Sequence, residues 1–310
     1  MYHPYFRGKQ FELITVRETA DVMAKAGFVP IIEPVKETLN GLDRALKAVC
    51  DAGGEAIVIV NPYHGDHAED GAGISALLRA KYLGTEQIGA GILLKEHTSV
   101  ATAMACYAAH EDHRPTFIHA GFTEGKALAA ELADVLDQTQ HVFFERHGKP
   151  YRRHFKGARR ILLRDGFEKR RNADHPPIEV FSDLHITYEE EDMDGFGDFL
   201  IVGDDYTEGG GPAYAVAIHL TFINPDDDDV MYIYHFVSDT KDTPTDPAGK
   251  FAQALAKLIA KLGTGASHLV ATSSIDEFRK LHKEGHFPGL GQVKKLSLIH
   301  HIETLADYLG

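Results

Sequence analysis

The sequence predicts an α/β fold, a (β/α)8 TIM-barrel-like domain with an added C-terminal β-hairpin and helices. Three observations carry this prediction: short apolar runs rich in β-branched residues recur along the chain, helical patterns separate most of them, and they number eight before residue 207. Such alternation is typical of parallel strands buried on both faces. Eight units suit a closed barrel, which needs about 250 residues. A doubly wound open sheet is the alternative, because strand count alone does not separate the two folds.

The expected strands start 19 to 39 residues apart, which leaves room for a helix in most intervals. They are Tyr2–Phe6, Val29–Val35, Ala56–Pro62, Gly89–Glu96, Thr116–Phe122, His141–Arg146, Arg160–Phe167 and Phe199–Tyr206. Between the second and third, Leu39, Leu42, Leu46 and Val49 follow helical spacing, and the glycine pair at 53–54 predicts the helix end. Comparable apolar stripes follow in the next intervals: Ile74, Leu77, Leu78 and Tyr82, then Val100, Ala103, Met104 and Tyr107, then Leu128, Leu132, Val135 and Leu136.

The last third of the chain departs from this repeat. Ala213–Phe222 and Val230–Ser238 predict an antiparallel hairpin, with the acidic run Asp226–Asp229 as its solvated tip. Helical patterns then run through Phe251–Leu262 and Leu298–Leu309. We find no linker, and therefore expect one elaborated domain over residues 1–310, with the barrel core in 1–212 and the hairpin and helices in 213–310.

Composition excludes several classes of protein. The chain of 310 residues is 44% hydrophobic and 25% charged, which is ordinary for a globular protein. Its 46 acidic and 32 basic residues give a net charge of −14, so bulk binding to nucleic acid or to an anionic membrane is not expected. The two cysteines, Cys50 and Cys106, lie in apolar-periodic segments, and no apolar leader or membrane span is evident. We expect a cytoplasmic protein with reduced thiols.

Ionisable residues stand at nearly every expected strand end. In a (β/α)8 barrel the strand ends meet at one face, where the functional site lies. The candidate catalytic residues are Lys9, Glu33, Lys95, Glu145 and Asp204. The candidate ligand-binding residues are Arg7, Asn61, His119, Arg164, Tyr206, Gly209 and Gly210. Glu33 is the sharpest of these, because it interrupts an apolar run and needs a partner if buried. We expect Glu33 or Glu145 to act as acid/base and Lys9 or Lys95 as electrophile or anion clamp.

Two features predict a phosphorylated ligand. The segment Lys149–Arg171 holds ten of the 32 basic residues against two acids, so a local patch could attract an anion that the whole protein repels. The triple glycine 209–211 follows the expected eighth strand, and barrel phosphate sites often use the loops after strands seven and eight. Glycine backbone N–H groups can approach an anion closely there.

No metal site is predicted. The segment Val58–His67 is similar to the strand and histidine loop of metallo-β-lactamase-type hydrolases, but Pro62 stands where the first histidine belongs. We expect His64, Asp66 and His67 not to converge. His219 and His235 lie within the expected hairpin strands, where we expect packed or hydrogen-bonded imidazoles.

Three short motifs resemble the beta family proteins, a poorly characterised family named after a phage beta protein. The first is Arg7-Gly8-Lys9 with Glu12, the second is Pro30 with Glu33, and the third is Gly203, Asp204 or Asp205, and Tyr206. The resemblance covers most of the chain. It implies a barrel-like α/β fold and an occurrence in phages and in mobile or defence-linked gene islands, but no established reaction.

Two functions are left open. The first is an enzyme that processes a phosphoester or nucleotide, as a hydrolase or transferase. The second is a non-catalytic sensor or partner subunit of a phage-defence system, with a protein partner from a neighbouring gene. Nucleophile-elbow, P-loop and Rossmann glycine motifs are missing from the sequence, so serine hydrolases, P-loop NTPases and Rossmann dehydrogenases lose support. The sequence identifies no cofactor.

Overall fold

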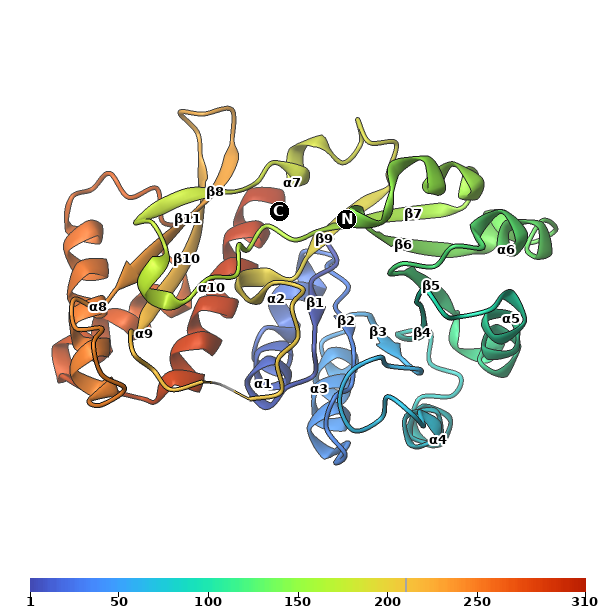
Figure 1. Ribbon diagram of the computed structural model, residues 1–310, viewed down its shortest axis with the longest axis horizontal. Helices are drawn as coiled ribbons and strands as arrows, with labels where there is room; N and C mark the ends of the chain where they lie inside the picture. The colour runs from blue at the N-terminus through green and yellow to red at the C-terminus, as the bar shows by residue number, and fades with distance from the viewer. Residues whose placement is uncertain (210) are drawn as a thin grey trace. The chain divides into compact units, whose positions relative to one another are not determined.

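The computed structural model describes residues 1–209 and 211–310, which divide into two compact units. Unit 1 comprises Met1–Asp165 and Thr187–Phe199, and unit 2 comprises Gly166–Ile186 and Leu200–Gly310. Each unit is therefore built from two separate stretches of chain (Figure 1). That the whole chain behaves as one domain stays a prediction.

Unit 1 is a (β/α)8 barrel. Its eight parallel strands are neighbours in chain order: β1 (Tyr5–Phe6), β2 (Ile31–Ile32), β3 (Ala56–Ile59), β4 (Ile88–Leu94), β5 (Thr116–His119), β6 (Gln140–Phe144), β7 (Arg159–Arg164) and β9 (Gly195–Asp198). Beside β1, Tyr2 forms a parallel bridge with Phe196, and the His3 amide donates to the Phe196 carbonyl at 2.8 Å. The sheet thus returns to its first strand. The predicted barrel is confirmed, and the open doubly wound sheet is excluded.

Helices separate most of the barrel strands, as the apolar stripes predict. They are α1 (Gln10–Glu18), α2 (Ala20–Lys25), α3 (Asn40–Asp51), α4 (Ala72–Lys81), α5 (Val100–Ala109) and α6 (Gly125–Glu131). Helix α3 buries Leu42, Leu46 and Val49, which share one face at helical spacing. Between β6 and β7 the connection is a 3-10 helix, η4 (Lys149–Phe155), instead of an α-helix.

The barrel interior is a packed apolar core. Alternate residues of the strands point inward, because successive side chains of a strand face opposite sides. The inward set comprises Tyr5, Val29, Ile31, Ile57, Ile59, Leu93, Ile118, Ala120, Val142, Phe144, Ile161, Leu163 and Phe199. Near the C-terminal ends of the strands, the rings of Tyr5, Phe144 and Phe199 pack with centroids 5.0 to 5.6 Å apart. This aromatic layer lies directly below the polar residues at the C-terminal strand ends.

The position predicted for the eighth strand is wrong. That strand is β9, just before Phe199, while Leu200–Val202 forms a 3-10 turn, η6, in which Leu200 has a φ of +50°. The reason is steric: a Cβ on Gly197 would lie 2.1 Å from the His3 carbonyl oxygen, so the closing strand needs glycine there. A Gly-Phe-Gly-Asp strand has little β-propensity, so the strand was predicted in the apolar run that follows it, Phe199–Tyr206.

Unit 2 contains a three-stranded antiparallel sheet in the order β10 (Ala217–Asn224), β11 (Val230–Val237), β8 (Ile178–Ser182). The hairpin β10–β11 is confirmed, with Asp226, Asp227 and Asp228 exposed at its tip. Strand β8 is a finding of the structure, since no strand was predicted there. The helices are α8 (Pro247–Gly263), α9 (Ser273–Glu284) and α10 (Leu290–Leu309), with the short α7 (Leu184–Thr187) at the boundary between the units.

One face of this sheet forms the core of unit 2. The core includes Ile218, Leu220 and Phe222 of β10, Tyr234 and Phe236 of β11, and residues of α8, α9 and α10. By strand alternation, His219 and His235 belong to the other face of the hairpin. None of the helices in the described part of the chain is long and apolar enough to span a bilayer.

Candidate functional site

The C-terminal strand ends of the barrel carry inward-facing polar residues. Tyr5 and Ile31 belong to the barrel core, and the residues two positions later are Arg7 and Glu33. The same spacing leads from Ile59 to Asn61 and from Leu93 to Lys95. Because strand alternation repeats every two residues, these side chains continue the inward face above the aromatic layer.

Glu33 is the centre of this group and is fully buried. Its Oε2 atom accepts a hydrogen bond from the Tyr5 hydroxyl at 2.8 Å and pairs with the Arg7 guanidinium. Its Oε1 atom accepts from the backbone amides of Tyr63 at 2.9 Å and His64 at 3.0 Å. The imidazole Nδ1 of His64 lies 3.0 Å from the same oxygen. The predicted need of Glu33 for a partner is thus met by a cation and by donors of the loop after β3.

The charge state of Glu33 follows from these contacts. Burial alone would raise the pKa of Glu33, but the hydrogen bond with His64 and the charge of Arg7 outweigh burial and lower the pKa to about 2. An ionised carboxylate with five donors has little capacity to give or take a proton at neutral pH. This environment favours a positioning role for Glu33 over the acid/base role expected from the sequence.

His64 is the group that Glu33 positions. Its side chain is 21% exposed, so one edge of the imidazole meets solvent while Nδ1 faces the buried carboxylate. A carboxylate on one ring nitrogen orients the imidazole, as in catalytic carboxylate–histidine pairs. Gly65 lets the loop after β3 approach the backbone at the end of β2. Its φ is +78°, and a Cβ at this position would lie 2.1 Å from the Val35 carbonyl oxygen.

The structure brings Lys95 to this group but gives Asn61 another role. The Lys95 ammonium lies 4.3 Å from the ring centroid of Tyr63, next to His64. Asn61 donates to the Leu93 carbonyl at 2.9 Å and accepts from the Leu93 amide at 2.8 Å, which ties the ends of β3 and β4 together. Lys9 is half-buried just before α1, and its carbonyl accepts from the Leu13 amide.

Glu145 and Arg164 form their own pair at the ends of β6 and β7. The guanidinium makes two hydrogen bonds to the carboxylate, at 2.7 and 2.8 Å. Both directly follow inward-facing core residues, Phe144 and Leu163. Arg164 is the last residue of β7, so its side chain starts from the opposite face of the wall to Glu33. Glu145 begins the 3-10 helix η3 (Glu145–His147) and pairs with Arg164, whereas Glu33 pairs with Arg7.

His119 lies on the outer face of the barrel wall. Its neighbours Ile118 and Ala120 point inward, so the imidazole points outward and is buried there. It forms a chain with His141 at 2.9 Å and with the Tyr151 hydroxyl at 2.7 Å, and His141 continues to Thr139 at 2.9 Å. The structure therefore separates His119 from Glu33.

The remaining candidates belong to unit 2. Asp204 is buried and Asp205 lies 3.7 Å from the Lys169 ammonium. Tyr206 and Gly209 follow in the same segment, and Gly210 lies outside the described residues.

A cavity of about 560 Å³ lies at the C-terminal side of the first three barrel strands. Gly8 from the loop after β1, Lys36 from the loop after β2 and Asp66 from the loop after β3 all line it. Helices α1 and α3 add the cationic side chains Arg17 and Arg44. Three cations thus face one space, with Gln10 and Thr38 as further hydrogen-bonding groups and with Glu37 and Asp66 as the acids.

The sequence analysis missed Arg17, Lys36 and Arg44. Arg17 lies in the last turn of α1 and Arg44 within α3, away from the strand ends, whereas Lys36 directly follows the predicted strand Val29–Val35 and could have been included. Gly41 was a signal in the sequence that α3 packs closely against α1 beside this cavity. A Cβ on Gly41 would lie 3.1 Å from the Leu13 side chain, so α3 needs a small residue there.

The basic run Lys149–Arg171 is largely neutralised by acids of the chain. Seven of its ten cations lie within 4.0 Å of a carboxylate: Lys149 and Arg152 with Glu191, Arg160 with Asp192, Arg164 with Glu145, Lys169 with Asp205, Arg170 with Glu179, and Arg171 with Asp174. Its value as a phosphate patch is correspondingly smaller than the sequence indicates.

The loop that is similar to a histidine metal loop directs its side chains to separate partners. His64 faces Glu33, His67 lies 3.1 Å from the Lys36 carbonyl, and Asp66 accepts from the Glu37 amide at 2.7 Å. These contacts hold the loops after β2 and β3 together beside the cavity.

Comparison with known protein-family models and with curated proteins finds no match for this sequence. The family resemblance therefore stays a prediction.

Proposed function

We propose that the barrel binds a phosphorylated small molecule, such as a nucleotide, at the C-terminal side of β1, β2 and β3. The observation that carries the proposal is the cavity of about 560 Å³ with Arg17, Lys36 and Arg44 on its wall. This volume lies within the range of small-molecule sites, which are roughly 300–1,000 Å³. Guanidinium groups match phosphate oxygens in pairs, and the ammonium adds a point charge.

His64 is the residue we assign to proton transfer in hydrolysis or transfer at the phosphoester. It lies two residues before Asp66, which lines the cavity, and Glu33 holds its Nδ1 edge. A positioned general acid or base contributes about 10²–10⁴-fold to a rate. The enzyme is proposed to act in the cytoplasm, which agrees with two free thiols at Cys50 and Cys106.

Binding is tested by thermal unfolding and calorimetric titration with inorganic phosphate, pyrophosphate and AMP. A ligand that binds only the folded state stabilises it by about 2.7 kcal/mol at a hundredfold excess over Kd. We expect stabilisation of the natural sequence, and weaker binding for Arg17→Gln and Arg44→Gln. Arg114→Gln is the matched control, because Arg114 lies outside this cavity and pairs with Glu55 at 3.0 Å. Equal melting with and without all three ligands would contradict the proposal.

Catalysis is tested separately with His64→Gln. Glutamine can still donate to Glu33 but cannot carry a proton. We expect this variant to retain AMP binding while phosphate release from AMP falls about 10²–10⁴-fold. Unchanged phosphate release would remove His64 from the mechanism and leave the binding site standing.

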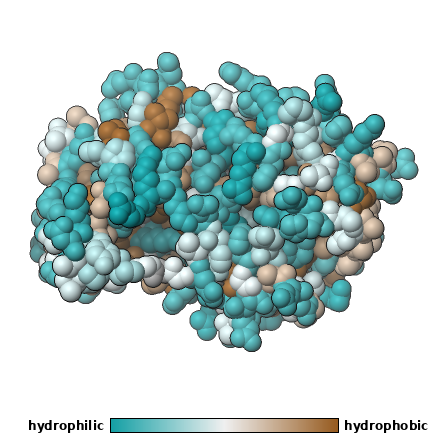
Figure 2. Space-filling model, in the orientation of Figure 1, coloured by the Kyte–Doolittle hydropathy of each residue, from teal (hydrophilic) through white to brown (hydrophobic). Residues whose placement is uncertain are grey.

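A partner subunit is the second candidate function, and one observation favours it. Strand β8 is an edge strand of the unit 2 sheet, and its Ile178 and Val180 are 43% and 55% exposed. Figure 2 shows hydrophobic colour over β8 on a face that is otherwise mostly hydrophilic. Exposed apolar edge strands are sites of strand addition by another chain. Co-purification with a co-expressed neighbouring gene product should be lost in Val180→Asp and kept in Val230→Asp, a change at the hairpin tip.

A further inference from the structure

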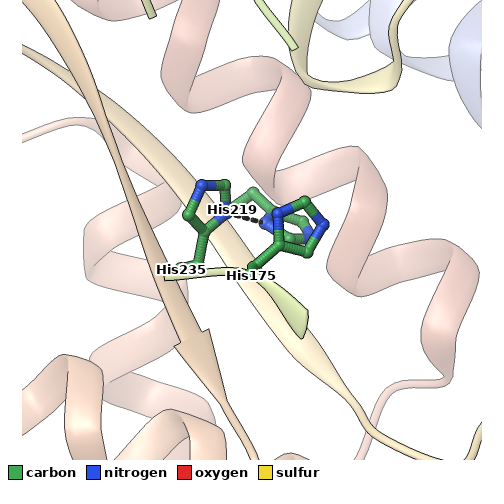
Figure 3. A group of neighbouring side chains, drawn as sticks. All are labelled: His175, His219 and His235. Carbon is green, nitrogen blue, oxygen red and sulfur yellow. Dashed lines mark hydrogen bonds between the residues drawn. The ribbon is translucent and has the colours of Figure 1, made fainter. Parts of the chain in front are cut away.

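Three histidines from distant parts of unit 2 meet at one point. His175 precedes β8, His219 lies in the middle of β10, and His235 lies directly opposite His219 on β11. One ring nitrogen from each lies within 4.8 Å of the other two (Figure 3). The Nδ1 atoms of His219 and His235 are 2.6 Å apart. Among the described residues this is the only group of three or more histidine, cysteine or carboxylate side chains placed in this way.

The three imidazoles are neutral, which is the form that binds metals. Burial lowers the pKa of all three imidazoles. The pKa of His175 is lowered, that of His219 falls well below its usual range, and that of His235 falls to about 4. Neighbouring imidazoles and Arg170 add to the effect. A neutral imidazole has one nitrogen with a lone pair and one with a proton. In the hydrogen bond between the facing Nδ1 atoms of His219 and His235 one nitrogen carries the proton, and a metal ion would take the place of that proton.

The carboxylate of Glu179 orients His235 from the side of the ring that faces away from His219. Glu179 accepts a hydrogen bond from Nε2 of His235 at 3.0 Å, so the lone pair of His235 is on Nδ1, which faces His219. Arg170 holds the same Glu179 oxygen at 2.5 Å. Carboxylates that accept the far N–H of a histidine ligand are the usual second layer of zinc sites. Nδ1 of His175 is buried and lies 3.9 Å from the same Glu179 oxygen.

The surroundings combine an apolar shield with an opening. The ring of Phe167 lies 5.2 to 6.2 Å from the three imidazole rings. His219 and Phe167 also line a cavity of about 270 Å³ whose wall includes Asn172. His175 and His235 are buried, whereas His219 is half-buried at this wall. An exogenous molecule thus has room beside the group.

We infer that His175, His219 and His235 bind one divalent transition-metal ion, Zn²⁺ by preference, with a coordination position directed to the adjacent cavity. Three imidazoles with a fourth position for water or substrate is an established zinc arrangement. Imidazole without any charged oxygen ligand disfavours Ca²⁺ and Mg²⁺, which require oxygen donors. Tetrahedral bonds of about 2.0–2.1 Å place ligand nitrogens about 3.3 Å apart, so His219 and His235 separate slightly as the ion enters.

The test uses the full-length protein stripped of metal with a chelator and then titrated with Zn²⁺ against a chromophoric competitor. The variants are His175→Asn, His219→Asn and His235→Asn, and the matched control is His282→Asn on α9, outside the group. Far-UV circular dichroism establishes that each variant is folded. Co²⁺ replaces Zn²⁺ in a second experiment, because its visible absorption reports a tetrahedral nitrogen site and needs no enzymatic activity.

We expect about one equivalent of Zn²⁺ per natural chain and per control chain, and affinity lowered about 10–100-fold or more by removing any one ligand. A folded protein whose Zn²⁺ affinity is the same in the natural chain and in His219→Asn would overturn the inference. So would a Co²⁺ spectrum typical of octahedral coordination. If two variants fail to fold, the Co²⁺ spectrum of the natural chain and the affinity of the third variant still decide the matter.

Discussion

The two faces of the barrel wall treat buried ionisable groups in opposite ways. On the inner face, Glu33 is charged, because Arg7, His64 and backbone amides surround it and lower its pKa to about 2. On the outer face, His119 and His141 are neutral: burial lowers the pKa of His141 to about 3 and that of His119 well below its usual range. Within the described part of the chain, their side-chain hydrogen bonds run to each other, to Tyr151 and to Thr139.

Burial opposes charge on both faces, so the difference lies in the donors. A buried carboxylate keeps its charge when a cation and several N–H groups compensate for lost water. A buried imidazole next to hydroxyls and another imidazole gains nothing from a proton and gives it up. The inner face thus keeps charged side chains that can bind charged ligands, whereas the neutral imidazoles of the outer face connect the barrel strands to the segment that covers them.

The largest effect we expect is from Glu33→Ala, which leaves Arg7 buried without its counter-charge. Breaking a buried ion pair costs about 3–5 kcal/mol of unfolding free energy. Urea unfolding measures it, with Glu55→Ala as control. Glu55 pairs with Arg114 at a site where both side chains are 52% exposed, and such pairs contribute about 0–1 kcal/mol. Equal losses in the two variants would remove the distinction between the inner face and an ordinary surface pair.

A smaller loss is expected from His119→Phe on the outer face. Phenylalanine preserves the ring but leaves Tyr151 and His141 without their partner, which costs about 1–3 kcal/mol. The double variant His119→Phe with His141→Phe should recover part of this loss, since the unpaired imidazole is then gone. A double variant less stable than the sum of the two single changes would show that the imidazoles do more than satisfy each other.

Acid should affect the two faces in different pH windows. An imidazole whose folded pKa is lowered from 6.5 to about 3 contributes stability above pH 6.5 that is lost as the pH falls toward 3. The Glu33 contribution is present above pH 4.5 and is lost as the pH falls toward 2. His141→Phe should therefore flatten the dependence of unfolding free energy on pH between 6 and 4.5 by up to about 1.4 kcal/mol per pH unit.

The control for this measurement is Glu33→Gln, which should leave the slope between pH 6 and 4.5 unchanged and alter it only below. Denaturant unfolding at a series of pH values gives both slopes. If His141→Phe changed nothing in that window, its imidazole would not be the buried neutral group described above.

Sequence patterns predicted most of the barrel because its strands are apolar and β-branched. Seven of the eight strands were placed with shifted ends, and the eighth was misplaced because Gly195–Asp198 is selected by close packing against the N-terminal segment. Strand β8 escaped prediction because it is a half-exposed edge strand after two prolines, with no continuous apolar run. Local propensity carries little information in both cases.

The candidate site was partly predictable for a similar reason. Glu33 interrupts an apolar strand, and the structure surrounds it with Arg7 and the loop after β3. Alternation separates His119 from it, a distinction that needs strand boundaries accurate to one residue, and Glu145 pairs with Arg164 instead. The grouping of His175 with His219 and His235 depends on the pairing of β8 with β11, which no local pattern announces.

The path of the chain between the units has a consequence for folding. The chain leaves unit 1 at Asp165, supplies β8 to unit 2, returns at Thr187 to supply the last barrel strand, and then completes unit 2. During synthesis β8 must wait for β11, about 50 residues later, and the bridge from Tyr2 to Phe196 spans almost the whole barrel segment. Both closures are non-local, so folding should be slow, with β8 unpaired in early intermediates. A chain cut at residue 212, the predicted end of the barrel core, would contain β8 but lack β11, the strand that pairs with it.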